Sequence, residues 1–78
     1  MRDHIIIPRA IERLADLNAT DAELDVIEAQ AALLAKTPKL GYFLPFSNSR
    51  ELRRYDVGRF GLIYKYDEKR LEVVTVVG

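Results

Sequence analysis

The stretch RRYDVGRFGLIYKYDEKRLEVVTVV, residues 53–77, decides the fold. In this half of the chain the side-chain pattern takes the two-residue period of β-strands. Turn-forming residues interrupt it at Gly58 and again at residues 66–70. We therefore expect an antiparallel meander of three strands, over residues 50–57, 59–66 and 70–77.

The first half of the chain predicts one strand and two helices. The β-branched run at residues 4–7 is followed by Pro8, which fits the first turn of a helix, and apolar residues at helical spacing predict that helix over residues 9–17. The stretch TDAE, starting at Thr20, is a capping box that begins a second helix, which we expect to end near Lys36.

Together these elements predict a single α+β domain over residues 1–78. The two helices are expected to form an antiparallel hairpin that covers one face of a small, mainly antiparallel sheet, with residues 4–7 as its fourth strand. Residues 37–50 contain two prolines, a glycine and several apolar side chains, so we expect this loop to pack over the edge of the core or against a partner. Tyr64 is expected in the core.

Composition narrows the function classes. The 78 residues are 49% hydrophobic and 31% charged, which is typical of one globular core, and there is no cysteine, so we expect no metal and no cofactor. No apolar run approaches the roughly 20 residues that cross a bilayer, and the N-terminus lacks the pattern of a signal peptide. We therefore expect a cytoplasmic protein without a membrane partner.

Charge is balanced overall but uneven along the chain. The 12 basic and 12 acidic residues cancel, which argues against indiscriminate nucleic-acid binding. Residues 1–31 hold three basic and seven acidic side chains, a balance of −4, whereas residues 32–65 hold seven basic and two acidic ones, a balance of +5. The basic half predicts either a solvated, charged sheet surface or a contact surface for RNA or an acidic partner.

The order of these elements carries a resemblance to a known family. The chain resembles the RelE/ParE superfamily of bacterial toxins from type II toxin–antitoxin systems. The resemblance rests on a strand, a helical hairpin, a loop with Pro38 and Gly41, a basic strand and then VGRFGLIYKYDEKRLEVVTVV, residues 57–77. The resemblance covers nearly the whole chain. It implies a cognate antitoxin protein as partner, and either cleavage of messenger RNA on the ribosome without a metal or inhibition of DNA gyrase by binding.

For the ribonuclease activity, the resemblance implies that basic side chains surround the reacting phosphate. Arginine suits this role because its planar guanidinium holds two phosphate oxygens and stays charged. The residues expected to act here are Arg53, Arg54 and Arg59, with Tyr55 as the candidate general acid in their positive field. Arg53 and Arg54 are adjacent, so only one of them should face a given side of the sheet.

The sequence departs from the family pattern at Gly61, where an arginine is expected after the aromatic residue. Arg59 has the same strand parity as Gly61 and is the nearest substitute on that face. The family nucleases also carry an arginine and a tyrosine in a tail after the valine-rich strand, and Gly78 is the last residue here. These departures leave room for an alternative, which the neutral overall charge also fits: a non-catalytic binding module of the same fold, either a gyrase inhibitor or a protein that binds only its antitoxin or a second copy of itself.

Overall fold

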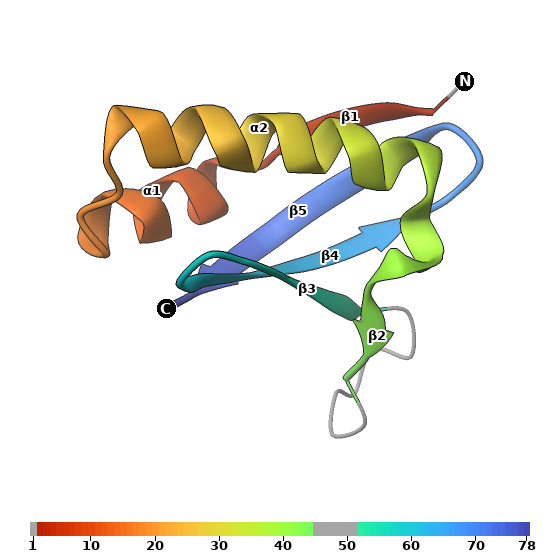
Figure 1. Ribbon diagram of the computed structural model, residues 1–78. Helices are drawn as coiled ribbons and strands as arrows, with labels where there is room; N and C mark the ends of the chain where they lie inside the picture. The colour runs from red at the N-terminus through yellow and green to blue at the C-terminus, as the bar shows by residue number, and fades with distance from the viewer. Residues whose placement is uncertain (1, 45–51) are drawn as a thin grey trace.

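The computed structural model describes residues 2–44 and 52–78 and places them in one five-stranded sheet with two α-helices on one of its faces (Figure 1). The elements in chain order are β1 (Asp3–Ile6), α1 (Pro8–Asp16), α2 (Asp21–Lys36), the 3₁₀ helix η1 (Pro38–Leu40), β2 (Tyr42–Phe43), β3 (Arg53–Val57), β4 (Phe60–Tyr66) and β5 (Arg70–Val77). The predicted α+β class and element order are confirmed. None of the described helices is long and apolar enough to cross a membrane.

The sheet is mixed and mostly antiparallel, with the strand order β1-β5-β4-β3-β2. The last three strands form the predicted meander, and β1 joins its far edge parallel to β5. A register shift between Ile63 and Tyr64 interrupts the pairing of β4 with β5. The face of the sheet that the helices leave uncovered is called the outer face below.

The boundaries of both helices follow from local chemistry. Helix α1 ends in a left-handed residue, Asn18 (φ 56°), whose amide bonds to the Ala15 carbonyl while the amide of Ala19 bonds to that of Leu14. These two bonds are the Schellman arrangement, in which asparagine tolerates the positive φ that glycine usually supplies. Helix α2 begins with the predicted capping box, in which the Glu23 amide donates to the Thr20 hydroxyl and the Thr20 amide donates to the Glu23 carboxylate.

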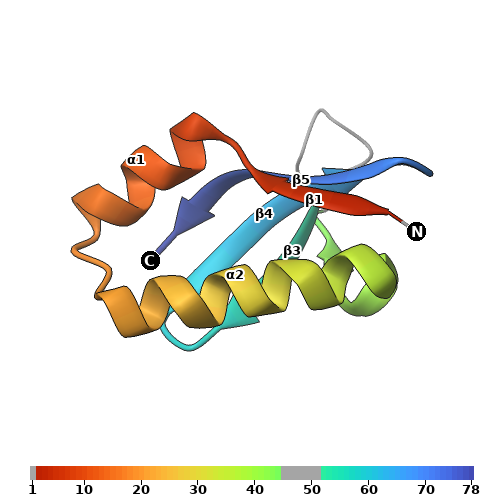
Figure 2. The same cartoon turned by 90° about the horizontal axis from the view of Figure 1, so that it is seen from above.

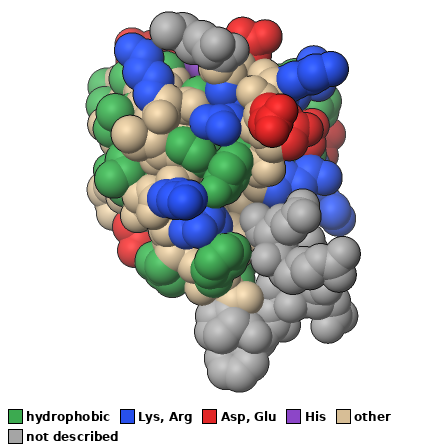
Figure 3. Space-filling view, turned by 90° about the vertical axis from the view of Figure 1, so that its right-hand side faces the viewer, with side chains coloured by type: hydrophobic (Ala, Val, Ile, Leu, Met, Phe, Trp, Pro, Cys, Tyr) green, Lys and Arg blue, Asp and Glu red, His purple; other side chains and the backbone are tan. Residues whose placement is uncertain are grey.

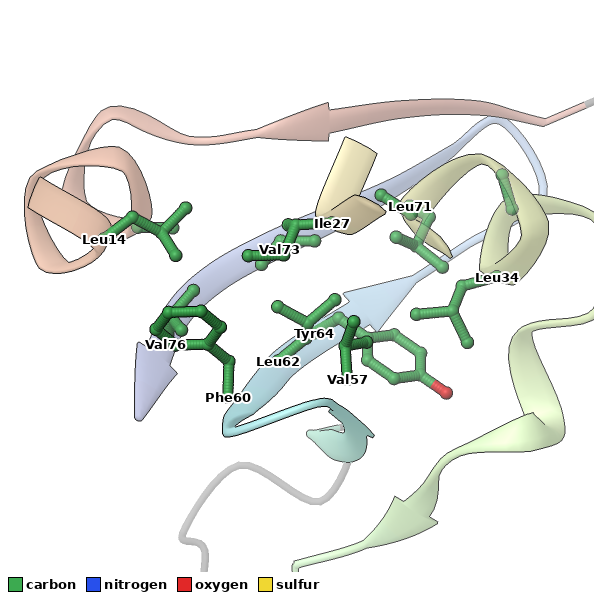
Figure 4. Packing of buried hydrophobic residues seen from close by; sticks show 13 residues of the cluster. Leu14, Ile27, Leu34, Val57, Phe60, Leu62, Tyr64, Leu71, Val73 and Val76 are labelled. Atoms are coloured by element: carbon green, nitrogen blue, oxygen red, sulfur yellow. The ribbon is translucent and has the colours of Figure 1, made fainter. Parts of the chain in front are cut away.

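The core lies between the helices and the meander (Figure 4). Helix α1 packs mainly on β5, and α2 packs on β1 and β5; the chain reverses direction between the two helices (Figure 2). Tyr64 is fully buried, as predicted. The largest fully buried side chains are Tyr64, Ile27, Leu34, Leu62, Leu71, Val73 and Val76.

The segment after α2 differs from the expected loop. Residues 37–44 form η1 and the short strand β2, which pairs antiparallel with β3 and adds a fifth strand to the sheet. Sequence reasoning missed this strand because Tyr42 and Phe43 lie among residues typical of turns. The rest of the predicted loop, together with the predicted strand start at residue 50, lies outside the described residues.

Candidate functional site

Arg53 and Arg54 point to opposite faces of the sheet, as their adjacency predicted. In the β3–β4 register Arg53 lies opposite Tyr64, whose side chain is in the core, and Arg54 lies opposite Ile63 on the outer face. The two guanidinium groups therefore cannot share one site on a single face of the sheet.

Arg53 holds β2 in place. Its Nη1 donates a hydrogen bond to the carbonyl oxygen of Gly41 at 2.7 Å, and its guanidinium carbon lies 3.9 Å from the centroid of the Phe43 ring. A stacked cation of this kind stabilises an exposed aromatic ring by about 0.5–1 kcal/mol. Part of the hydrogen-bonding capacity of Arg53 is therefore used within the chain.

Gly41 is also bonded from the core side. Its amide donates to the hydroxyl of Tyr64 at 2.9 Å, and the same hydroxyl donates to the carbonyl of Pro38. Burial raises the pKa of Tyr64, so this hydroxyl remains a neutral donor at physiological pH. A side chain at position 41 would collide with Tyr64 and with the Arg54 carbonyl oxygen, which would be 2.7 Å from an added Cβ. This contact explains the glycine of the Pro38–Gly41 motif.

Arg54 covers Gly61 on the outer face. Its Nε lies 2.8 Å from Oδ1 of Asp56, and a Cβ added at Gly61 would be 2.7 Å from the Arg54 guanidinium carbon. The Asp56 carboxylate raises the pKa of Arg54 above its ordinary value. The guanidinium next to position 61 is thus supplied by the neighbouring strand.

Arg59 does not reach the face of Gly61, and the expectation from strand parity is wrong here. Arg59 lies in the β3–β4 turn, not in a strand, and its side chain extends to the helix side, where Nε and Nη2 bond to the two carboxylate oxygens of Glu23 at 2.8 and 3.0 Å. Nη2 also donates to the Asn18 carbonyl at 3.2 Å, and the guanidinium stacks 4.4 Å from the centroid of the Phe60 ring.

The Arg59–Glu23 pair joins the turn to the start of α2. Two hydrogen bonds lower the pKa of the Glu23 carboxyl from 4.5 to about 2: the bond from Arg59 has the larger effect, and the bond from the Thr20 amide the next largest. Glu23 therefore caps the helix and binds Arg59 with the same carboxylate.

Tyr55, the candidate general acid, is partly buried and packs against the core. It lies opposite Leu62, on the same sheet face as Arg53. Arg53 and the β3–β4 turn that carries Arg59 are at opposite ends of the hairpin, separated by about 13 Å along β3 at ~3.3 Å per residue. The structure thus brings Tyr55 near Arg53 but keeps Arg54 and Arg59 in separate surroundings. The catalytic roles of all four residues stay predictions.

Exposed aromatic residues lie in β2, within the loop whose apolar side chains we expected at the edge of the core or on a partner. Phe43 lies opposite Arg53, and Tyr42 lies opposite Arg54 on the outer face. Tyr42 and Phe43 are 53% and 56% exposed, and Leu40 is 51% exposed. Figure 3 shows the side of the molecule on which η1 and β2 lie, where hydrophobic side chains are interspersed with those of Lys and Arg. The apolar run at residues 42–44, which is unusual in a loop, is part of the basis for that expectation.

The edge of β3 is a second accessible feature. β2 pairs only with Arg53 and Arg54, so within residues 2–44 and 52–78 the outer edge of β3 is unpaired at residues 55–57. Beside it, a pocket of about 250 Å³ lies between α2 and the β3–β4 turn, with Ala22, Val26 and Val57 among its lining residues. An unpaired strand edge next to an apolar pocket can accept an extended segment of another chain.

No family model and no curated protein matches the chain. Across the described ranges, no group of three His, Asp or Glu side chains is placed to hold a metal ion.

Proposed function

We propose that this protein is the toxin component of a RelE/ParE-like toxin–antitoxin pair, and that it acts by binding its target and not by cleaving RNA. The element order and the β3–β5 meander support the family. The distribution of the arginines supports binding: Arg53, Arg54 and Arg59 each make a different local interaction, and they do not converge on one phosphate-sized space. Groups that catalyse as a unit must be held in one aligned geometry.

The cognate antitoxin would dock at the free edge of β3. An extended antitoxin segment would add a strand at residues 55–57, with an apolar side chain in the pocket between α2 and the β3–β4 turn. DNA gyrase is the target that this binding activity favours. At β2, Phe43 with Arg53 on one face and Tyr42 beside Arg54 on the other supply exposed aromatic and cationic groups, which are enriched at protein interfaces.

The primary test is induced expression in bacterial cells, with and without the product of the neighbouring gene. We expect growth arrest that the neighbouring product relieves, and inhibition of supercoiling by purified gyrase when the purified protein is added. The Tyr42→Ala/Phe43→Ala variant should lose inhibition, whereas Ile11→Ala, which removes an equally exposed residue from α1, should keep it. Unimpaired growth at high expression would refute the proposal.

Antitoxin docking has its own readout. Backbone amides of an antiparallel strand alternate between its two edges, so within residues 55–57 only the amides that do not bond to β4 point to the free edge. Hydrogen exchange at these amides should slow when the neighbouring gene product is added. The opposite sheet edge, β1, is the internal control and should be unaffected. Slowed exchange at β1 alone would place the antitoxin elsewhere.

Ribosome-dependent RNA cleavage is the second candidate, and the aromatic and cationic surface favours it. Unpaired bases stack on exposed aromatic rings while arginine contacts the backbone phosphates, and Phe43 with Arg53 provides both groups 3.9 Å apart. Mapping messenger RNA ends after induction distinguishes the candidates. New ends that disappear in the Arg53→Ala/Arg54→Ala variant would establish cleavage, and intact messages during growth arrest would support binding.

A further inference from the structure

Helix α2 has two apolar faces, and only one of them packs in the core. Ile27, Ala31, Leu34 and Ala35 are buried against the sheet. A second stripe is exposed along the helix, with Val26 at 50% and Leu33 at 40%, and its four members are Ala22, Val26, Ala29 and Leu33. At 3.6 residues per turn, the centres of the two faces lie roughly 150° apart around the helix axis. The exposed stripe therefore points away from the buried face of α2, and at its N-terminal end Ala22 and Val26 line the pocket beside the β3–β4 turn.

The spacing of the exposed stripe is that of a helix–helix seam. Its residues are separated by four, three and four positions, the a/d spacing with which two α-helices pack against each other. Alanine at two of the four positions allows the backbones to approach to the shorter end of the usual 8–10 Å interaxial range. A helix that only covers a sheet needs one apolar face, so the second face calls for a partner.

The charges beside the stripe reverse sign along the helix. Asp21 and Asp25 lie in its first half, and Lys36 and Lys39 lie at and just after its end. Within the described residues, neither Asp25 nor Lys36 forms an ion pair. An antiparallel copy of the same helix would place each acidic end beside a basic end, whereas a parallel copy would place like charges together.

We infer that the exposed stripe of α2 is a self-association surface. A second copy of this chain docks its own α2 there, antiparallel to the first and related to it by a two-fold axis. Val26 of one protomer meets Leu33 of its partner, Asp25 lies near the partner's Lys36, and Ala29 lies next to the axis. Such an interface uses the same patch on both copies and therefore requires a self-complementary charge pattern, which this helix has. Self-association does not depend on whether the protein is a toxin. Because Ala22 and Val26 also line the pocket proposed for the antitoxin, a docked antitoxin and the second copy exclude each other at this end of α2.

Cross-linking of single-cysteine variants tests the geometry directly, because the natural chain has no cysteine. In the antiparallel dimer the Ala29→Cys variant should be joined efficiently by a short bis-maleimide, since the two positions meet at the axis. The Ala22→Cys variant should not, because its two copies would be about 22 Å apart along the helix at 1.5 Å per residue. Efficient cross-linking of Ala22→Cys would indicate a parallel arrangement and overturn the inference.

Analytical ultracentrifugation of the full chain, from low micromolar to millimolar concentration, measures the dimer itself. Ala29→Glu brings two like charges together at the axis and should raise the dissociation constant by at least about tenfold. Ile11→Glu adds the same charge to the exposed face of α1 and should leave it unchanged. A monomer at every concentration, or a dimer disrupted by Ile11→Glu and not by Ala29→Glu, would contradict the inference.

Charge exchange provides an independent check of the orientation. Asp25→Lys and Lys36→Asp should each weaken the dimer, since each places like charges opposite one another. The double variant should restore association, because the pair is re-formed with reversed sign. If the double variant is weaker than both single variants, Asp25 and Lys36 do not face each other and the antiparallel register is wrong.

Discussion

The hydroxyl of Tyr64, on the central strand of the meander, accepts a hydrogen bond from the amide of Gly41 and donates one to the carbonyl of Pro38. One buried side chain therefore satisfies two backbone groups of the segment that connects α2 to β2. This relationship fixes the position of β2 and, through the bond from Arg53 to the Gly41 carbonyl, part of the candidate site. An unpaired buried backbone group costs about 1–3 kcal/mol.

Tyr64→Phe removes the hydroxyl and keeps the ring. We expect the free energy of unfolding to fall by about 1–3 kcal/mol, because the Gly41 amide and the Pro38 carbonyl lose their partner. Urea denaturation measures the change. Tyr66→Phe is the matched control on the same strand, since the Tyr66 hydroxyl forms no hydrogen bond within the described residues. Equal losses in the two variants would show that the Tyr64 hydroxyl has no special role.

The glycines at positions 41 and 61 should respond differently to alanine. At Gly41 the added Cβ meets the Arg54 carbonyl oxygen and the Tyr64 ring, which cannot move without disturbing the sheet, so Gly41→Ala should destabilise by about 1–3 kcal/mol. At Gly61 the Cβ meets only the flexible end of Arg54, so Gly61→Ala should change stability by less than about 1 kcal/mol. Thermal unfolding of both variants provides the comparison, and a larger loss at Gly61 would contradict it.

Local chemistry in the sequence predicted much of this fold. The capping box at Thr20 located the start of α2, and strand periodicity located the meander and placed Arg53 and Arg54 on opposite faces. These features depend on neighbouring residues, so the sequence contains enough information to predict them.

The parts that were missed depend on contacts between distant residues. The alternation of side chains along a strand predicted that Arg59 faces the same side of the sheet as Gly61. Arg59 lies in the turn, however, and its side chain reaches Glu23, 36 positions earlier. β2 forms because Arg53 and Tyr64 hold Gly41 from two sides, and no local pattern in residues 37–44 encodes that contact. Residues near the candidate site were therefore the hardest to place.

Glu23 should make the fold sensitive to acid. Its pKa in the folded protein is about 2, below its ordinary value of 4.5, so its stabilising contribution is complete above pH 4.5 and is lost as the pH falls toward 2. Melting temperatures of the wild type and Glu23→Gln measured from pH 7 to pH 2 should converge at the acid end. NMR titration of the Glu23 carboxyl carbon measures its pKa directly, and Arg59→Ala should raise that value. A midpoint near 4.5 in the wild type would contradict the Arg59 contact.

The adjacent residues Leu33 and Leu34 separate the two faces of α2. Leu34 is fully buried, so Leu34→Ala leaves a cavity and should reduce the free energy of unfolding by about 2–5 kcal/mol. Leu33 lies in the exposed stripe, so Leu33→Ala should change the free energy of unfolding of the monomer by about 0.5 kcal/mol or less.

Chemical denaturation at low protein concentration measures both effects without a contribution from self-association. At high protein concentration the wild type should be more stable than at low concentration, because dimerisation stabilises the folded state by mass action. The Leu33→Ala variant should not gain this stability, because its exposed stripe is incomplete. If Leu33→Ala and the wild type gain equally, the association uses a different surface. If Leu33→Ala is as destabilising as Leu34→Ala at low protein concentration, the exposed stripe of α2 is part of the monomer core.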